Sequence, residues 1–141
     1  RGAARTRRSA TGSPAISAVA GDLVVRMIDE FPAFMIAAAC AEGETVVRDA
    51  AELRAKESDR IAIMTAELRA LGVDVEEFPD GFRIRGTGRI PGGATVRAHG
   101  DHRVAMSLAL AALVAEAPVT IEGFEMLNES FPDFPRILQL R

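Results

Sequence analysis

Ionisable side chains gather at the predicted starts of four helices. Asp29 and Glu30 stand just before an apolar segment that begins at Pro32, and Asp133 stands near the start of the last helix. Two longer clusters open the other helices: Lys56-Glu57-Ser58-Asp59-Arg60 and Asp101-His102-Arg103. The free N–H groups of a helix N-terminus carry a partial positive charge, so several converging termini would form a site for phosphate or carboxylate. The alternative is ordinary capping and solvated surface at each helix start.

Three cations in these clusters, Lys56, Arg60 and Arg103, lie at the helix end where positive charge is disfavoured. Each of them therefore needs an external anion or a nearby carboxylate. Lys56 and Arg60 are four residues apart, so on one helix they would share a face, with Glu57 beside Arg60. His102 is a candidate for catalysis or an ordinary residue of a capped helix start.

Composition and missing motifs narrow the function classes. The 141 residues carry a net charge of −3 and no Trp or Tyr, which argues against nucleic acid and for small ligands. No glycine-rich nucleotide fingerprint, phosphate loop or HExxH motif supports a nucleotide or zinc site. The apolar runs are too short to span a membrane, and the single Cys40 cannot form an internal disulfide. We expect a cytoplasmic protein that does not bind membranes.

Helical spacing of apolar residues predicts the elements that carry the clusters. Residues 32–41 are nearly all apolar after Pro32, and Asp101 can cap an apolar helix over residues 104–115. Residues 132–141 also have helical character. Between these segments one apolar stripe runs up to Gly72, where a C-terminal cap is expected: Ile61, Met64, Leu68 and Leu71.

Runs rich in β-branched and apolar residues predict the strands. Residues 73–76 and 82–85 alternate in polarity on either side of the turn Pro79-Asp80-Gly81, which predicts a β-hairpin. Residues 86–93 are predicted to be a loop. Further strands are predicted at residues 23–27, 44–48, 94–98 and 118–122.

The order of these elements repeats along the chain. Residues 41–43 align without a gap with residues 115–117, and the same alignment places Val46 on Thr120. We infer a mixed α and β fold built from repeated βαβαββ units, with one unit and part of a second in this chain. Residues 1–20 are interpreted as a flexible lead-in or the end of a preceding unit, and residues 21–141 as an incomplete barrel.

Four motifs carry a resemblance to a known family: Ile28-Asp29-Glu30-Phe31-Pro32, Glu52-Leu53-Arg54-Ala55-Lys56-Glu57-Ser58-Asp59-Arg60, Gly100-Asp101-His102-Arg103-Val104-Ala105-Met106 and Ser130-Phe131-Pro132-Asp133-Phe134. In this order and spacing they resemble the 5-enolpyruvylshikimate-3-phosphate synthases, the enolpyruvyl transferases of the shikimate pathway that glyphosate inhibits. The resemblance implies part of the C-terminal lobe of an α/β prism, an inside-out barrel whose helix N-termini face a cleft between two lobes. It implies no cofactor and no metal.

The same resemblance implies a substrate contact for each candidate residue. Asp29 would bind the attacking hydroxyl of shikimate 3-phosphate and take its proton, and Lys56 would touch that substrate. Glu57 would exchange a proton at the methylene carbon of phosphoenolpyruvate. Arg60 and Arg103 would hold the carboxylate and phosphate of phosphoenolpyruvate, with His102 beside them.

Two acidic positions complete the candidate set. Glu52 opens the second motif, and Glu129 stands where many members of the family carry a Lys that points at phosphoenolpyruvate. The resemblance also implies that the missing N-terminal lobe supplies most contacts to the shikimate phosphate. This fragment alone would then be inactive, and the intact protein would be a monomer.

Two other functions stay open. An enolpyruvyl transferase acting on UDP-N-acetylglucosamine belongs to a sister family that these motifs match less well. A non-catalytic binding module that kept the fold is the second, and the charge reversal at Glu129 favours it.

Overall fold

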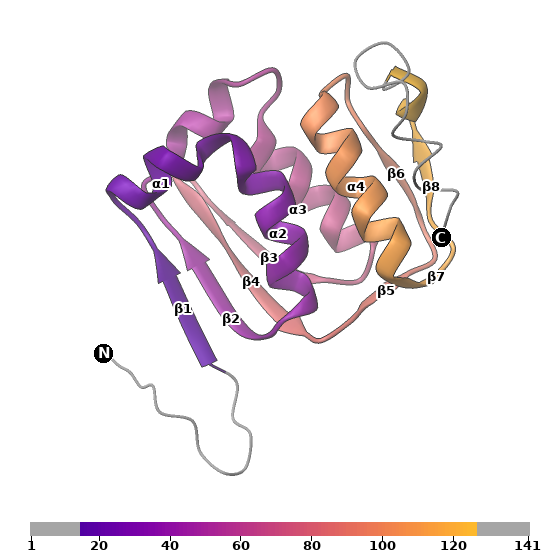
Figure 1. Cartoon of the computed structure of the whole chain (residues 1–141), viewed down its shortest axis with the longest axis horizontal. Helices are drawn as coiled ribbons and strands as arrows, with labels where there is room; N and C mark the ends of the chain where they lie inside the picture. The colour runs from indigo at the N-terminus through magenta and orange to yellow at the C-terminus, as the bar shows by residue number, and fades with distance from the viewer. Residues whose placement is uncertain (1–14, 127–141) are drawn as a thin grey trace.

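The chain contains both helices and strands in the structure, a computed structural model that describes residues 15–126 (Figure 1). The α-helices are α1 Asp22–Met27, α2 Phe31–Cys40, α3 Arg60–Ala70 and α4 His102–Val114. The strands are β1 Ala15–Val19, β2 Glu42–Val47, β3 Asp74–Phe78, β4 Gly81–Thr87, β5 Ile90–Gly92, β6 Thr95–Arg97, β7 Ala115–Ala117 and β8 Thr120–Glu122. Short 3-10 helices are η1 Ile28–Glu30, η2 Ala51–Ala55 and η3 Phe124–Met126. None of the helices within this part of the chain has the length and apolar character to cross a membrane.

The first unit of the fold is a four-stranded sheet with its crossover helices. Its strand order is β1-β2-β4-β3, with β1 and β2 parallel and the other two pairings antiparallel. Together with α2 and α3, these strands follow one another as β1-α2-β2-α3-β3-β4, which confirms the predicted βαβαββ unit. Strand β1 belongs to this unit, although it lies within the residues interpreted as a lead-in or the end of a preceding unit.

Part of a second unit follows the first. Strand β5 pairs in parallel with β7, and β6 pairs in parallel with β8, with α4 as the connecting helix. In both units an apolar helix leads almost directly into a strand, since only Ala41 separates α2 from β2 and β7 follows α4 with no residue between them. The predicted alignment of residues 41–43 with 115–117 falls on these two junctions.

The core lies between the four-stranded sheet and the helices that cover it. Helix α2 contacts β4, α3 and α4, and its Phe31 ring meets Phe82 of β4 edge-on with 6.1 Å between the ring centroids. Met35 of α2 and Leu68 of α3 are fully buried beside them. Each such side chain contributes about 1.5–3 kcal/mol through burial. In Figure 1 the N-terminal ends of α2, α3 and α4 lie at the same end of the molecule.

Three expectations about the elements are wrong. Residues 23–27 lie in helix α1 instead of a strand, because a short segment with four apolar residues and Arg26 fits either period. The expected loop over residues 86–93 contains the end of β4 and all of β5. Helix α3 begins at Arg60 with Asp59 as its cap, so Lys56 and Glu57 precede the helix. The predicted helix from residue 132, with Asp133, lies outside the described residues.

Candidate active site

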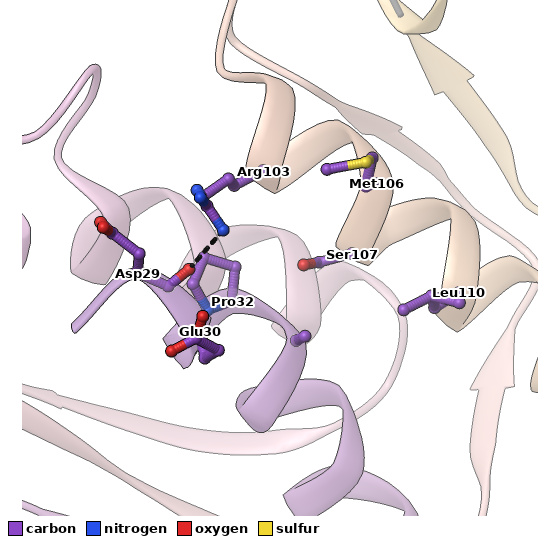
Figure 2. Close-up of a pocket in the computed structure, with 8 residues that line it drawn as sticks. Asp29, Glu30, Pro32, Arg103, Met106, Ser107 and Leu110 are labelled. Carbon is purple, nitrogen blue, oxygen red and sulfur yellow. Dashed lines mark hydrogen bonds between the residues drawn. The ribbon is translucent and has the colours of Figure 1, made fainter. Parts of the chain in front are cut away.

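The starts of α2, α3 and α4 converge on one another. Arg60, the first residue of α3, bonds to Asp101, the cap of α4. Arg103 reaches from the first turn of α4 and donates from Nη1 to the backbone oxygen of Asp29, just before α2, over 3.2 Å (Figure 2). The predicted clusters of Asp29, Lys56 to Arg60 and Asp101 to Arg103 therefore lie together.

A buried ion pair between Arg60 and Asp101 lies at the centre of the site. The side chains are 3% and 1% exposed, and the guanidinium meets both carboxylate oxygens, with Nε–Oδ2 at 2.8 Å and Nη2–Oδ1 at 3.2 Å. Ser58 donates its hydroxyl to Oδ2 of Asp101 over 2.7 Å. Asp101 also accepts the backbone N–H groups of Arg103 and Val104, which caps α4. One carboxylate thus joins the starts of two helices.

Burial and hydrogen bonding act in opposite directions on this pair. Burial alone would raise the pKa of Asp101, but the hydrogen bonds from Arg60 and Ser58 outweigh it and hold that pKa below its ordinary value. Burial would likewise lower the pKa of Arg60, and the hydrogen bond to Asp101 outweighs it and raises that pKa. Both groups are therefore charged at neutral pH.

The outer side of Arg60 is held by two carboxylates that water can reach. Glu57 Oε1 lies 2.8 Å from Nη2, and Asp29 Oδ1 lies 3.4 Å from Nη1. The Glu57 and Asp29 side chains are 67% and 48% exposed. An incoming anion would compete with these two groups, while Asp101 would keep Arg60 in place.

Lys56 and Arg60 both contact the carboxylate of Asp29, although they do not lie on the same helix. The backbone of Lys56 is extended and Lys56 stands outside α3, so the expected shared helix face does not exist. Nevertheless its Nζ lies 3.8 Å from Asp29 Oδ1 and 3.2 Å from Glu52 Oε2. Of the two expected ways to balance these cations, an external anion or a nearby carboxylate, the structure shows the second. Nearby carboxylates balance the positive charges of both Lys56 and Arg60. Glu52 thereby joins the site as a partner of Lys56.

Arg103 is the cation of the site with the most donors to spare. Its side chain is exposed, and the backbone oxygen of Asp29 is its hydrogen-bond acceptor within the described part of the chain. His102 is half-buried at the start of α4, and its ring has no hydrogen-bond partner among the described residues. Glu129, the second of the two acidic positions that complete the candidate set, lies outside those residues.

A hollow of about 200 Å³ opens beside these groups, between α2 and α4. Its polar end carries Asp29, Glu30 and Arg103, and its other end is mainly apolar (Figure 2). The remaining lining residues are Pro32, Ala33, Met106, Ser107 and Leu110. The hollow can therefore take a small molecule with an anionic end near Arg103.

The sequence-based expectations give Asp101 only a capping role, and they include neither its ion pair with Arg60 nor the hydrogen bond that it accepts from Ser58. The sequence offers one signal for this ion pair, the chemical type of Asp101. A carboxylate accepts several hydrogen bonds, so it can cap a helix and hold a guanidinium at the same time. Pairing it with Arg60 requires knowing that α3 and α4 start side by side. In the part of the chain that the structure describes, no group of three or more His, Cys, Asp and Glu side chains is arranged to hold a metal ion.

Comparison with known proteins assigns the chain to a family. The sequence model described as EPSP synthase (3-phosphoshikimate 1-carboxyvinyltransferase) matches residues 5–138. The chain belongs to the EPSP synthase family. An EPSP synthase structure from Acinetobacter baumannii superposes with a TM-score of 0.79 at 46% identity, over 84% of this chain and 28% of that one. The family fold confirms the inside-out arrangement of mixed α and β units.

Curated relatives extend the EPSP synthase comparison. The 3-phosphoshikimate 1-carboxyvinyltransferase of Halorhodospira halophila is 57% identical over 122 residues, which make up 86% of this chain and 27% of the relative. That of Pelotomaculum thermopropionicum is 51% identical over 122 residues, 86% of this chain and 28% of the relative. The chain thus spans less than a third of the length of these relatives.

Proposed function

We propose that this chain is the C-terminal lobe portion of an enzyme that transfers the enolpyruvyl group of phosphoenolpyruvate to the 5-hydroxyl of shikimate 3-phosphate, releasing phosphate. The observation that carries the proposal is the convergence of three helix starts on Arg60, with Glu57, Asp29 and Arg103 around it. The names of the curated relatives support the same reaction.

In the proposed reaction two carboxylates move protons. Asp29 accepts the proton of the attacking 5-hydroxyl. Glu57 takes up a proton from solvent when the substrate replaces it beside Arg60, and it delivers that proton to the methylene carbon of phosphoenolpyruvate. The hydroxyl oxygen bonds to the neighbouring carbon and gives a tetrahedral adduct. A methyl proton then returns to Glu57 as the bond to phosphate breaks. The two exposed carboxylates are the ones that an incoming substrate can reach, which supports these roles.

The cations of the site would bind the anionic substrates. Arg103 and Arg60 hold the carboxylate and phosphate of phosphoenolpyruvate, with His102 beside them, and Lys56 contacts shikimate 3-phosphate. Among the described residues the Arg103 side chain has one hydrogen-bond acceptor, the backbone oxygen of Asp29, which leaves its other donors for this purpose. Arg60 is preorganised by Asp101, so it needs no rearrangement when negative charge develops near it.

The missing part of the protein completes the proposed site. The relatives of this chain are more than three times as long as the segment that matches it. The remaining lobe would supply the other contacts to shikimate 3-phosphate. The chain alone is then inactive. We place the intact protein in the cytoplasm as a monomer that uses no cofactor and binds neither nucleic acid nor membrane.

A chimera tests the proposed function. The matching 122-residue segment of the Halorhodospira halophila enzyme is replaced by the corresponding part of this chain. We expect phosphate release from phosphoenolpyruvate with shikimate 3-phosphate and none with UDP-N-acetylglucosamine. A folded chimera that releases phosphate only with the nucleotide sugar would favour the sister transferase. Activity only after Glu129→Lys would favour the non-catalytic module.

A further inference from the structure

We propose that Arg54 is a positioning residue that fixes the segment carrying Lys56 and Glu57 from the side away from the substrate. The inference rests on the proposed function for its kinetic consequence. Arg54 lies in η2 and does not line the hollow between α2 and α4. Its guanidinium points instead at the β3–β4 hairpin and at Asp59.

The guanidinium of Arg54 uses every one of its nitrogens. Nε donates to the backbone oxygen of Pro79 over 2.8 Å, and Nη2 donates to that of Phe78 over 2.7 Å and meets Glu77 Oε2 at 2.9 Å. Nη1 contacts both oxygens of Asp59, at 3.2 and 3.0 Å. A planar fork can reach these five oxygens at once, which a Lys ammonium cannot match.

Asp59 links this fork to the site, because the same carboxylate caps α3. Its Oδ1 accepts the backbone N–H of Ala62 over 3.0 Å, and its backbone oxygen accepts the N–H of Ile63. The short segment 55–58 is therefore held at both ends, by Arg54 before it and by Asp59 after it. Lys56 and Glu57 are the site residues within that segment.

Lys56 and Glu57 depend on this support more than the arginines do. Arg60 is anchored by the buried Asp101, and Arg103 stands on α4, a different element. Weakening the Arg54 fork should therefore displace the proton-transferring Glu57 while the groups that bind phosphoenolpyruvate stay in place. A displacement of about 1 Å at a reacting group can cost 10²-fold in rate.

The test uses Arg54→Lys in the chimera, which keeps the positive charge and removes the fork. We expect kcat to fall roughly 10- to 100-fold with KM for phosphoenolpyruvate changed less than about twofold. The matched control is Arg83→Lys on β4, since Arg83 also contacts three carboxylates but none in this segment: Glu44, Asp74 and Glu76. The control should keep the kcat of the parent chimera.

A second variant covers the case in which Arg54→Lys does not fold. Asp59→Asn keeps a good helix cap and loses the ion pair with Arg54, so it should show the same split between kcat and KM. An unchanged kcat in a folded Arg54→Lys or Asp59→Asn protein would overturn the proposal. An equal loss in Arg83→Lys would also overturn it, because the effect would then be general destabilisation.

The proposal can be separated from the proposed function. If the parent chimera releases no phosphate, the proposed function is wrong. Hydrogen exchange on the 141-residue chain then tests the positioning role of Arg54 without any measurement of activity. Arg54→Lys should then speed amide exchange at Ala62 and Ile63, and Arg83→Lys should leave it unchanged. Unchanged exchange in Arg54→Lys would overturn the positioning role.

Discussion

Arg60 is bound from two sides by groups of different kinds. The buried Asp101 fixes the guanidinium, and the exposed Glu57 and Asp29 compensate its outer charge. In the proposed reaction these two carboxylates would have two functions, because they would neutralise Arg60 before substrate binds and would then transfer protons. Because Asp101 is buried and Glu57 and Asp29 are exposed, we expect substitutions of these residues to affect different properties of the protein.

Glu57 and Arg103 should differ in steady-state kinetics of the chimera. Glu57→Gln keeps the shape and removes proton exchange, so kcat should fall by roughly 10²- to 10⁴-fold with little change in KM. Arg103→Ala removes charge-assisted hydrogen bonds, worth about 1.5–3 kcal/mol each, so KM for phosphoenolpyruvate should rise and kcat/KM should fall at least tenfold. If Glu57→Gln alters KM alone, the residue positions substrate and transfers no proton.

Asp101 should contribute to the stability of the chain in a pH-dependent way. Because its folded-state pKa is lowered, the contribution is fully present above the unfolded-state pKa, about 3.9, and is lost as the pH falls through the folded-state value. Asp101→Asn leaves Arg60 buried with weaker partners and should cost about 3 kcal/mol at pH 7. Urea unfolding of both proteins should show this difference shrinking below about pH 4. A difference that stays constant down to pH 2 would contradict the assignment.

The β3–β4 turn supports much of the structure around the site. Asp80 in this turn accepts the backbone N–H groups of Asp49 and Ala50, and Arg48 pairs with its carboxylate at 3.1 Å. The same turn supplies the acceptors for Arg54. One hairpin therefore holds both the segment after β2 and the segment before α3.

Helix α2 lies unusually close to strand β4 where Gly86 stands. A Cβ at this position would lie 2.0 Å from the backbone oxygen of Ala41 and 2.3 Å from that of Ala38. Gly86→Ala should therefore lower the free energy of unfolding of the chain by at least about 2 kcal/mol, measured by urea unfolding. The matched control is Arg85→Ala on the exposed side of β4, which should stay within about 0.5 kcal/mol. Equal losses in the two variants would show that the close approach does not matter.

The elements that sequence reasoning predicts correctly carry strong local signals. Helix α3 has a single apolar stripe with Asp59 before it and Gly72 after it, and the hairpin has a Pro-Asp-Gly turn. Strand β5 has no such signal, because Pro91 and two glycines mark it as a loop while its partner β7 lies far along the chain. The Arg60–Asp101 pair is hidden for the same reason, since it depends on packing between two units.

The isolated chain should bind ligands weakly, because it matches only a small part of the length of its relatives. The chain spans 27% of the Halorhodospira halophila relative and would hold part of the proposed anion site. We expect it to bind phosphoenolpyruvate or phosphate with a dissociation constant in the millimolar range or weaker, because ~4 kcal/mol of binding already needs several charged contacts. Calorimetry can measure this, and adding the rest of the relative should raise the affinity. Submicromolar binding by the chain alone would contradict the need for a second lobe.

The two outer strands of the four-stranded sheet differ in a way that bears on how the chain behaves at high concentration. Strand β3 presents Asp74, Glu76 and Glu77 along one edge, and such charges discourage a strand of another molecule from adding there. Strand β1, at the opposite edge, reads Ala-Ile-Ser-Ala-Val and has no charged residue. Among the described strands nothing but β2 pairs with it. Self-association of the isolated chain would therefore begin by intermolecular strand pairing at β1, and a Lys in that strand is the change that should suppress it.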